Sequence, residues 1–155
     1  MFRTLLQWCA LLGAAASLSA VIVPVPALAA GVNPCSLVPG NLVTVLTGAP
    51  ATADLHKGMT TGRYAQDTCH YPGSLAKMFV VASHVDPAPF ATLKTQPELK
   101  PLAGIGADAL WWSGTGVIAM LKNGHYITMS WGGDMNKATP SAAFVAAAKA
   151  AASKL

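Results

Sequence analysis

The sequence predicts an α+β domain, a two-layer sandwich whose mainly antiparallel sheet of about five strands is covered by helices in the order α-β-β-α-β-β-β-α. Two observations lead to this class. Short runs rich in β-branched and aromatic residues alternate with turn residues, and two of these runs flank Asn123-Gly124, the preferred two-residue hairpin turn. The chain has 155 residues, which suits one ordinary core, so residues 31–155 are expected to form a single domain.

Residues 1–30 have the layout of a secretory signal peptide. Arg3 precedes an apolar run that extends to Val23, and two prolines and an Ala-Leu-Ala sequence follow. Cleavage is expected after Ala29 or Ala30, which would release a secreted or periplasmic protein without a stable membrane anchor. An uncleaved anchor is the alternative, because the run is nearly long enough to span a bilayer.

Cleavage would remove Cys9 and leave Cys35 and Cys69. In an oxidising compartment such a pair is most simply a disulfide. The alternative joins Cys69 to His70 as a nucleophile and base, or as metal ligands. If residues 67–71 form a strand, neighbouring side chains point to opposite faces, which favours the disulfide. Neither Cys9, inside the apolar run, nor Cys35, after Val-Asn-Pro, has the setting of a lipidation site.

The charge pattern argues against a nucleic-acid partner. Only 10% of the residues are charged, and after loss of the leader nine basic residues face six acidic ones, a net charge of +3. The lysines form no run, and Arg63 is the one guanidinium left, although this group suits phosphate recognition best.

The first half of the domain is expected to form a helix and a hairpin. The helix covers residues 36–47, is interrupted by Pro39-Gly40 and ends at Gly48. The polar stretch 49–62 crosses to a first strand over residues 63–71, and a second strand lies within residues 76–85. Asp86 as N-cap and Pro87 at the first helical position predict a short helix, followed by a turn-rich connector and a strand near residues 107–113.

The Asn123-Gly124 turn fixes the pairing of the next two strands. The expected core face pairs Lys122 with His125, Met120 with Ile127, Ile118 with Met129 and Gly116 with Trp131; the other face pairs Leu121 with Tyr126, Ala119 with Thr128 and Val117 with Ser130. A final helix is expected to begin at Thr139-Pro140, with Phe144, Val145, Ala148, Ala152 and Leu155 on one stripe.

Several short motifs carry a resemblance to a known group. These are Asn33-Pro34-Cys35-Ser36-Leu37, Cys69-His70-Tyr71 and Gly104-Ile105-Gly106-Ala107-Asp108-Ala109, followed by a strand, a Lys-Asn-Gly turn, a strand and an Ala-rich helix. The chain resembles a family of small exported bacterial domains of unknown function, many of them actinobacterial lipoproteins. The resemblance implies a Cys35–Cys69 disulfide, an α+β sheet and an extracytoplasmic location, and it carries no catalytic residue across. This chain lacks the lipidation cysteine of the lipoprotein members.

No catalytic motif, cofactor site or metal site is predicted. The Gly104-Ile105-Gly106 doublet precedes a strand, whereas a dinucleotide loop follows one. His56, His70 and His84 are evenly spaced, but their neighbours share no repeat and supply no nearby carboxylate to orient the rings. His125 is expected to be a solvent-facing turn residue.

The tryptophan pair suggests a binding surface. Trp111 and Trp112 are adjacent on a predicted strand, so one of them joins the core and the other faces outward. With the outer side of the hairpin they give a candidate binding face of Trp111, Trp112, Val117, Leu121, Tyr126 and Thr128.

Three functions compete. The first is an exported, non-enzymatic binding or interaction domain of the bacterial cell envelope, with an unknown small-molecule or protein ligand. The second is an envelope structural or accessory protein whose sheet edge meets a protein partner. The third is a metal-binding protein or hydrolase centred on the histidines.

Overall fold

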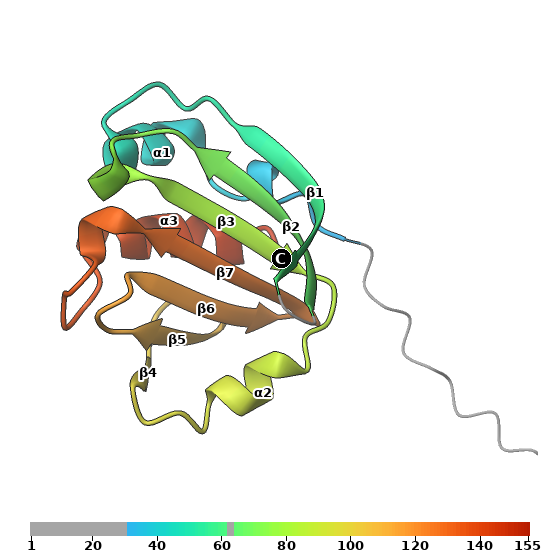
Figure 1. The fold of residues 1–155 in the computed structure, drawn as a ribbon. Helices are drawn as coiled ribbons and strands as arrows, with labels where there is room; N and C mark the ends of the chain where they lie inside the picture. The colour runs from blue at the N-terminus through green and yellow to red at the C-terminus, as the bar shows by residue number, and fades with distance from the viewer. Residues whose placement is uncertain (1–30, 62–63) are drawn as a thin grey trace, which may run out of the picture.

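Residues 31–61 and 64–155 are described by the computed structural model, and they form a seven-stranded antiparallel sheet with helices on both faces (Figure 1). The strands are ordered β1-β2-β3-β7-β6-β5-β4 across the sheet. Their bounds are β1 Asp54–Thr61, β2 Tyr64–Tyr71, β3 Phe79–His84, β4 Leu99–Pro101, β5 Asp108–Trp112, β6 Val117–Lys122 and β7 His125–Trp131.

The helices are α1 (Gly40–Thr47), α2 (Pro89–Leu93) and α3 (Ala142–Ala152), with short 3-10 turns η1 (Pro34–Ser36), η2 (Leu75–Lys77) and η3 (Gly132–Asp134). The predicted α+β class is confirmed. The predicted two-layer arrangement is wrong, because α2 packs on the face opposite α1 and α3, and the observed order is α-β-β-β-α-β-β-β-β-α. The predicted leader lies outside the described residues. Within residues 31–61 and 64–155, no helix is long and apolar enough to cross a membrane.

The β6–β7 hairpin has the register that its turn predicts. Ile118 pairs with Met129 and Met120 with Ile127, and all four side chains are fully buried. Asn123 and Gly124 both adopt positive φ, 50° and 79°, as a type I′ turn requires. A two-residue signal in the sequence therefore fixes the centre of the sheet.

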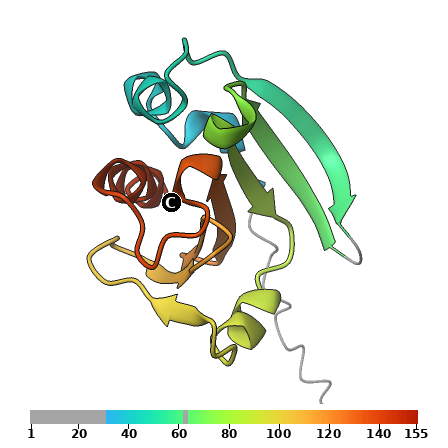
Figure 2. The same cartoon turned by 60° about the vertical axis from the view of Figure 1, so that its left-hand side comes forward.

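The face covered by α1 and α3, here called the inner face, holds the main core (Figure 2). Phe144 of α3 meets three rings edge-on, with centroid distances of 6.2 Å to Phe79, 6.2 Å to Trp111 and 5.9 Å to Trp131. Aromatic pairs prefer this geometry. The other buried side chains of α3 are alanines, so this helix can pack closely against α1 and β6.

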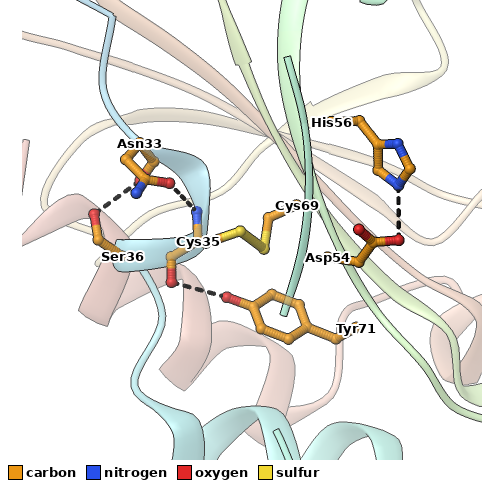
Figure 3. The surroundings of a disulfide bond; sticks show 7 residues. All are labelled: Asn33, Cys35, Ser36, Asp54, His56, Cys69 and Tyr71. Carbon is orange, nitrogen blue, oxygen red and sulfur yellow. Dashed lines mark hydrogen bonds and ion pairs between the residues drawn. A yellow bond between two sulfur atoms is a disulfide. The ribbon is translucent and has the colours of Figure 1, made fainter. Parts of the chain in front are cut away.

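The N-terminal segment is tied to this core by the Cys35–Cys69 disulfide, whose Cα atoms are 5.1 Å apart (Figure 3). Cys69 is completely buried on the inner face, and the Tyr71 hydroxyl donates to the Cys35 carbonyl at 3.0 Å. Burial raises the pKa of the Tyr71 hydroxyl, because the charged phenolate would lose its hydration. The disulfide expected from the residues is present, and His70 points to the opposite face of the strand.

The helices begin later than predicted: α1 at Gly40, after the expected interruption, and α2 and α3 two to three residues late. Gly48 ends α1 as predicted, in the left-handed conformation with φ 71°. However, α3 begins at Ala142 because the Ser141 hydroxyl accepts the Phe144 N–H at 3.3 Å. Likewise α2 begins at Pro89, and the Asp86 carboxylate caps the preceding turn by accepting the Ala88 N–H at 2.9 Å.

The predicted strand count of about five is wrong, because β1 and β4 were placed in connectors. The residues of β1 from Asp54 to Thr60 are exposed, so this strand lacks the apolar alternation that marks a half-buried strand. β4 has three residues and ends in Pro101, which removes a backbone donor. Both are edge strands held by backbone pairing with a neighbour, which a single segment does not reveal.

Candidate functional site

The face of the sheet opposite α1 and α3, here called the outer face, contains the candidate site. The strand register places five of the predicted binding residues on it: Trp112, Val117, Leu121, Tyr126 and Thr128. Trp112 is 36% exposed, whereas Val117, Leu121 and Thr128 are half-buried. The outer side of the hairpin therefore forms one continuous surface with the outward-facing tryptophan.

Trp111 does not belong to this surface. It is 2% exposed on the inner face, and its indole N–H donates to the Ala138 carbonyl at 3.1 Å. Successive side chains of a strand alternate between faces, so adjacent tryptophans cannot share one surface. The inclusion of Trp111 in the candidate binding face is therefore corrected, since it is a core residue.

Helix α2 covers part of the outer face, which the sequence did not indicate. Phe90 of α2 is 1% exposed and packs in a second hydrophobic cluster with Leu99, Leu110, Ala119 and Tyr126. This packing buries Tyr126, which was expected to be available to a ligand. Trp112 of β5 stays 36% exposed on the outer face, whereas Thr68 of β2 and Ala82 of β3 are buried there.

A cavity of about 230 Å³ lies where α2 meets β3 and β7, and we call it the α2 cavity. It is lined by His84, Pro89, Thr92, Leu93 and Tyr126. The rings of His84 and Tyr126 are stacked with centroids 4.1 Å apart and an interplanar angle of 16°. The cavity thus has a flat aromatic wall opposite the aliphatic side of a helix.

His84 is held in one orientation within this wall. Its Nε2 is hydrogen-bonded to Thr128 Oγ1 at 2.9 Å. Burial lowers the pKa of the His84 imidazole from 6.5 to about 4, because the charged ring would lose its hydration. The imidazole is neutral at pH 7, so no residue that lines the α2 cavity is charged there.

A second group of polar side chains gathers at the other end of the outer face, and we call it the Asp-His-His cluster. Asp54 of β1 lies opposite His70 of β2, and His56 follows two residues later on the same face. Asp54 Oδ2 is 2.9 Å from His56 Nε2 (Figure 3). The ring centroids of His56 and His70 are 4.8 Å apart, with an interplanar angle of 65°.

The expectation that no carboxylate lies near the histidines is wrong. Asp54 precedes His56 by two residues, and a strand places residues i and i+2 on one face. The spacing of Asp54 and His56 is visible in the sequence, but it places them on one face only if their segment is recognised as a strand. His84 and His125 lie elsewhere, in the α2 cavity and beside the hairpin turn.

The Asp-His-His cluster borders open space. Asp54 and His70 line a cavity of about 320 Å³, together with Thr52, Tyr71, Pro72, Gly73 and Met78. An open groove of about 560 Å³ continues from it past Thr52, Pro72 and Gly73 towards Lys77. A ligand of ordinary size could therefore reach the cluster.

The two sheet edges carry features that oppose strand addition. β1 contains Lys57 and a bulge between His56 and Met59, where Gly58 has a φ of 63° and donates its N–H to the Asp67 carboxylate at 2.8 Å. β4 is very short and ends in proline. Natural sheets use such charges, bulges and short edges to prevent pairing with other chains. The edges therefore disfavour the accessory-protein hypothesis.

Comparison with known proteins gives no assignment: no family model, no curated protein and no solved structure matches this chain. The resemblance to small exported bacterial domains stays a prediction.

Proposed function

We propose that this protein is an exported, non-enzymatic binding domain of the bacterial cell envelope, and that it holds its ligand on the outer face of the sheet. The leader-like sequence and the Cys35–Cys69 disulfide support export, because intrachain disulfides are typical of oxidising compartments. The observation that carries the binding function is the α2 cavity. It combines a preformed apolar hollow with a few fixed polar groups, as small-molecule sites do.

The size of the α2 cavity indicates what part of a ligand it takes. Its volume of about 230 Å³ is smaller than the range of about 300–1,000 Å³ that is typical of sites for whole drug-sized ligands. It therefore suits one ring or one aliphatic group of a longer ligand. The remainder of that ligand would lie outside the cavity, beside the half-buried Thr128.

The lining residues favour an uncharged group. Leu93 and Pro89 offer apolar contacts, and the Thr92 hydroxyl and the His84 imidazole can form hydrogen bonds. An ion would lose its hydration there without gaining an opposite charge. We expect a ring or short aliphatic chain that carries a hydroxyl or carbonyl group.

Amide NMR spectroscopy with phenol and cyclohexanol as probes tests this proposal. We expect millimolar probe to shift the amides of His84, Thr92, Leu93 and Tyr126. Thr92→Trp should abolish these shifts by filling the α2 cavity. Ala91→Trp is the matched control, because Ala91 is exposed on the same helix and does not line the cavity. Shifts that survive in Thr92→Trp, or that spread over the whole surface, would refute the proposal.

A further inference from the structure

The cavity of about 320 Å³ at the Asp-His-His cluster and the open groove of about 560 Å³ next to it form one depression, which we call the β1 groove. Thr52, Pro72 and Gly73 line both parts, so a ligand can extend from one into the other. No residue lines both the β1 groove and the α2 cavity. A ligand of the β1 groove is therefore independent of the one proposed for the α2 cavity.

Asp54 gives one end of the β1 groove a negative charge. Its side chain is 69% exposed, and Oδ2 lies 2.9 Å from His56 Nε2 (Figure 3). Oδ1 accepts no hydrogen bond from the described residues. Within residues 31–61 and 64–155, no group of three His, Cys, Asp or Glu side chains could hold a metal ion. The free carboxylate oxygen is instead suited to an ammonium group of a ligand, which donates hydrogen bonds and carries the opposite charge.

Lys77 gives the other end of the β1 groove a positive charge. Its side chain is exposed and lies beside Gly48, where a Cβ atom would be 3.4 Å from Lys77 Nζ. Gly48 ends α1, and the partial negative charge of a helix C-terminus favours a cation nearby. No carboxylate of the described residues pairs with this ammonium group, whereas Lys94 and Lys137 each have such a partner. Lys77 can therefore receive an anionic group of a ligand.

The chain between the two ends sets the spacing of the charges. Asp54 pairs with His70, and the three residues from His70 to Gly73 span roughly 10 Å when extended. Gly73 lies directly against Lys77, because a Cβ atom there would be 2.7 Å from the Lys77 carbonyl oxygen. An extended peptide advances by about 3.3–3.6 Å per residue, so about three residues cover this distance. A free amino acid carries its two charges too close together to reach both ends.

The walls between the charges suit a peptide with small side chains. Pro72 and Met78 offer apolar surface, and Met78 is 44% exposed although it is a large apolar residue. The hydroxyl groups of Thr52 and Ser74 can form hydrogen bonds with peptide groups. Capture of a terminal amine or carboxylate is a common way to recognise a peptide.

We propose that the β1 groove binds a peptide of about three residues with small side chains. Its amino terminus pairs with Asp54 and its terminal carboxylate with Lys77. Because the two ends of the groove have opposite charges, the peptide binds in one direction.

Amide NMR titration with trialanine tests this site. We expect shifts of the amides of Thr52, Gly73, Ser74 and Met78. N-acetyl-trialanine lacks the amino charge and trialanine amide lacks the carboxylate. Each should bind about three- to fivefold more weakly, which is the effect of one exposed ion pair. Free alanine should bind more weakly than all three peptides.

Two variants assign the charges. Asp54→Asn should abolish the difference in affinity between trialanine and N-acetyl-trialanine, and Lys77→Gln the difference between trialanine and its amide. A general effect on folding would not remove one of these differences and leave the other. Lys149→Gln is the matched control, because Lys149 is an exposed lysine of α3 that does not line the β1 groove. It should bind the three peptides as the wild type does.

Three results would overturn the proposal. The first is a trialanine titration that shifts no amide of the β1 groove. The second is equal affinity of the wild type for the three peptides, since neither terminal charge would then be recognised. The third is free alanine that binds as tightly as trialanine, because the spacing of the two charges would then have no effect.

Discussion

The inner and outer faces are built from the same strands but have different chemistry. On the inner face, Phe79 and Trp111 of the sheet contact Phe144 of α3, and each of the three side chains is at most 2% exposed. The outer face instead holds the Asp-His-His cluster, the His84–Tyr126 stack and two cavities, and among the helices of the described residues only the five-residue α2 packs on part of it. The difference indicates that the inner face supplies most of the stability and leaves the outer face available for binding.

Substitution of the two adjacent tryptophans is expected to give the largest difference in stability between the two faces. Trp111→Ala should lower the free energy of unfolding by about 3–5 kcal/mol, because it removes a large, fully buried side chain. Trp112→Ala, one residue away on the outer face, should change it by about 1 kcal/mol or less. Urea unfolding followed by circular dichroism measures both. Equal losses in the two variants would show that the outer face contributes as much to stability as the inner face.

Removal of the disulfide also tests how much the inner face contributes to stability, because the disulfide lies on that side of the sheet. Replacing Cys35 and Cys69 together by serine should lower the free energy of unfolding by about 2–4 kcal/mol. The variant would lose the covalent link between η1 and β2, but it would keep the hydrogen bond from Tyr71 to the carbonyl of residue 35 and the burial of Leu37 and Val38 in the core.

A reductant provides the control for this prediction. Dithiothreitol should lower the urea midpoint of the wild type and leave that of the double variant unchanged. An unchanged wild-type midpoint after complete reduction would mean that packing, and not the disulfide, holds the N-terminal segment.

Local signals in the sequence predict the middle of the sheet well. The Asn123-Gly124 turn and the apolar alternation on both sides of it are sufficient to define the register of β6 and β7. The end of α1 is predicted by an equally local signal, since Gly48 adopts the left-handed conformation that ends many helices. In each case the residues that carry the signal are close together in the chain.

The features that the sequence did not reveal depend on distant partners. β1 carries two apolar side chains, Leu55 and Met59, which are exposed and do not alternate regularly with polar ones, so its own residues give no periodic signal, and it becomes a strand by pairing with β2. The packing of α2 on the outer face depends on contacts of Phe90 with residues from β4 to β7. The Asp-His-His cluster was not predicted because β1 was not predicted: Asp54 and His56 share a face only if their segment is a strand.

His84 gives the smallest expected effect, and it tests whether the outer face contributes a pH-dependent part of the stability. The folded state lowers the pKa of His84 from 6.5 to about 4, so between these values the unfolded chain binds more protons than the folded one. The stability that neutral His84 provides is therefore complete above pH 6.5 and is lost as the pH falls towards 4.

His84→Gln keeps a hydrogen-bonding group near Thr128 and does not titrate. Over this interval the urea midpoint of the variant should fall less than that of the wild type, whereas His125→Gln should behave as the wild type does. If His84→Gln and the wild type lose stability in parallel, His84 must be hydrated in the folded state, and the α2 cavity would then be open to water and not the dry, uncharged site that an apolar group requires.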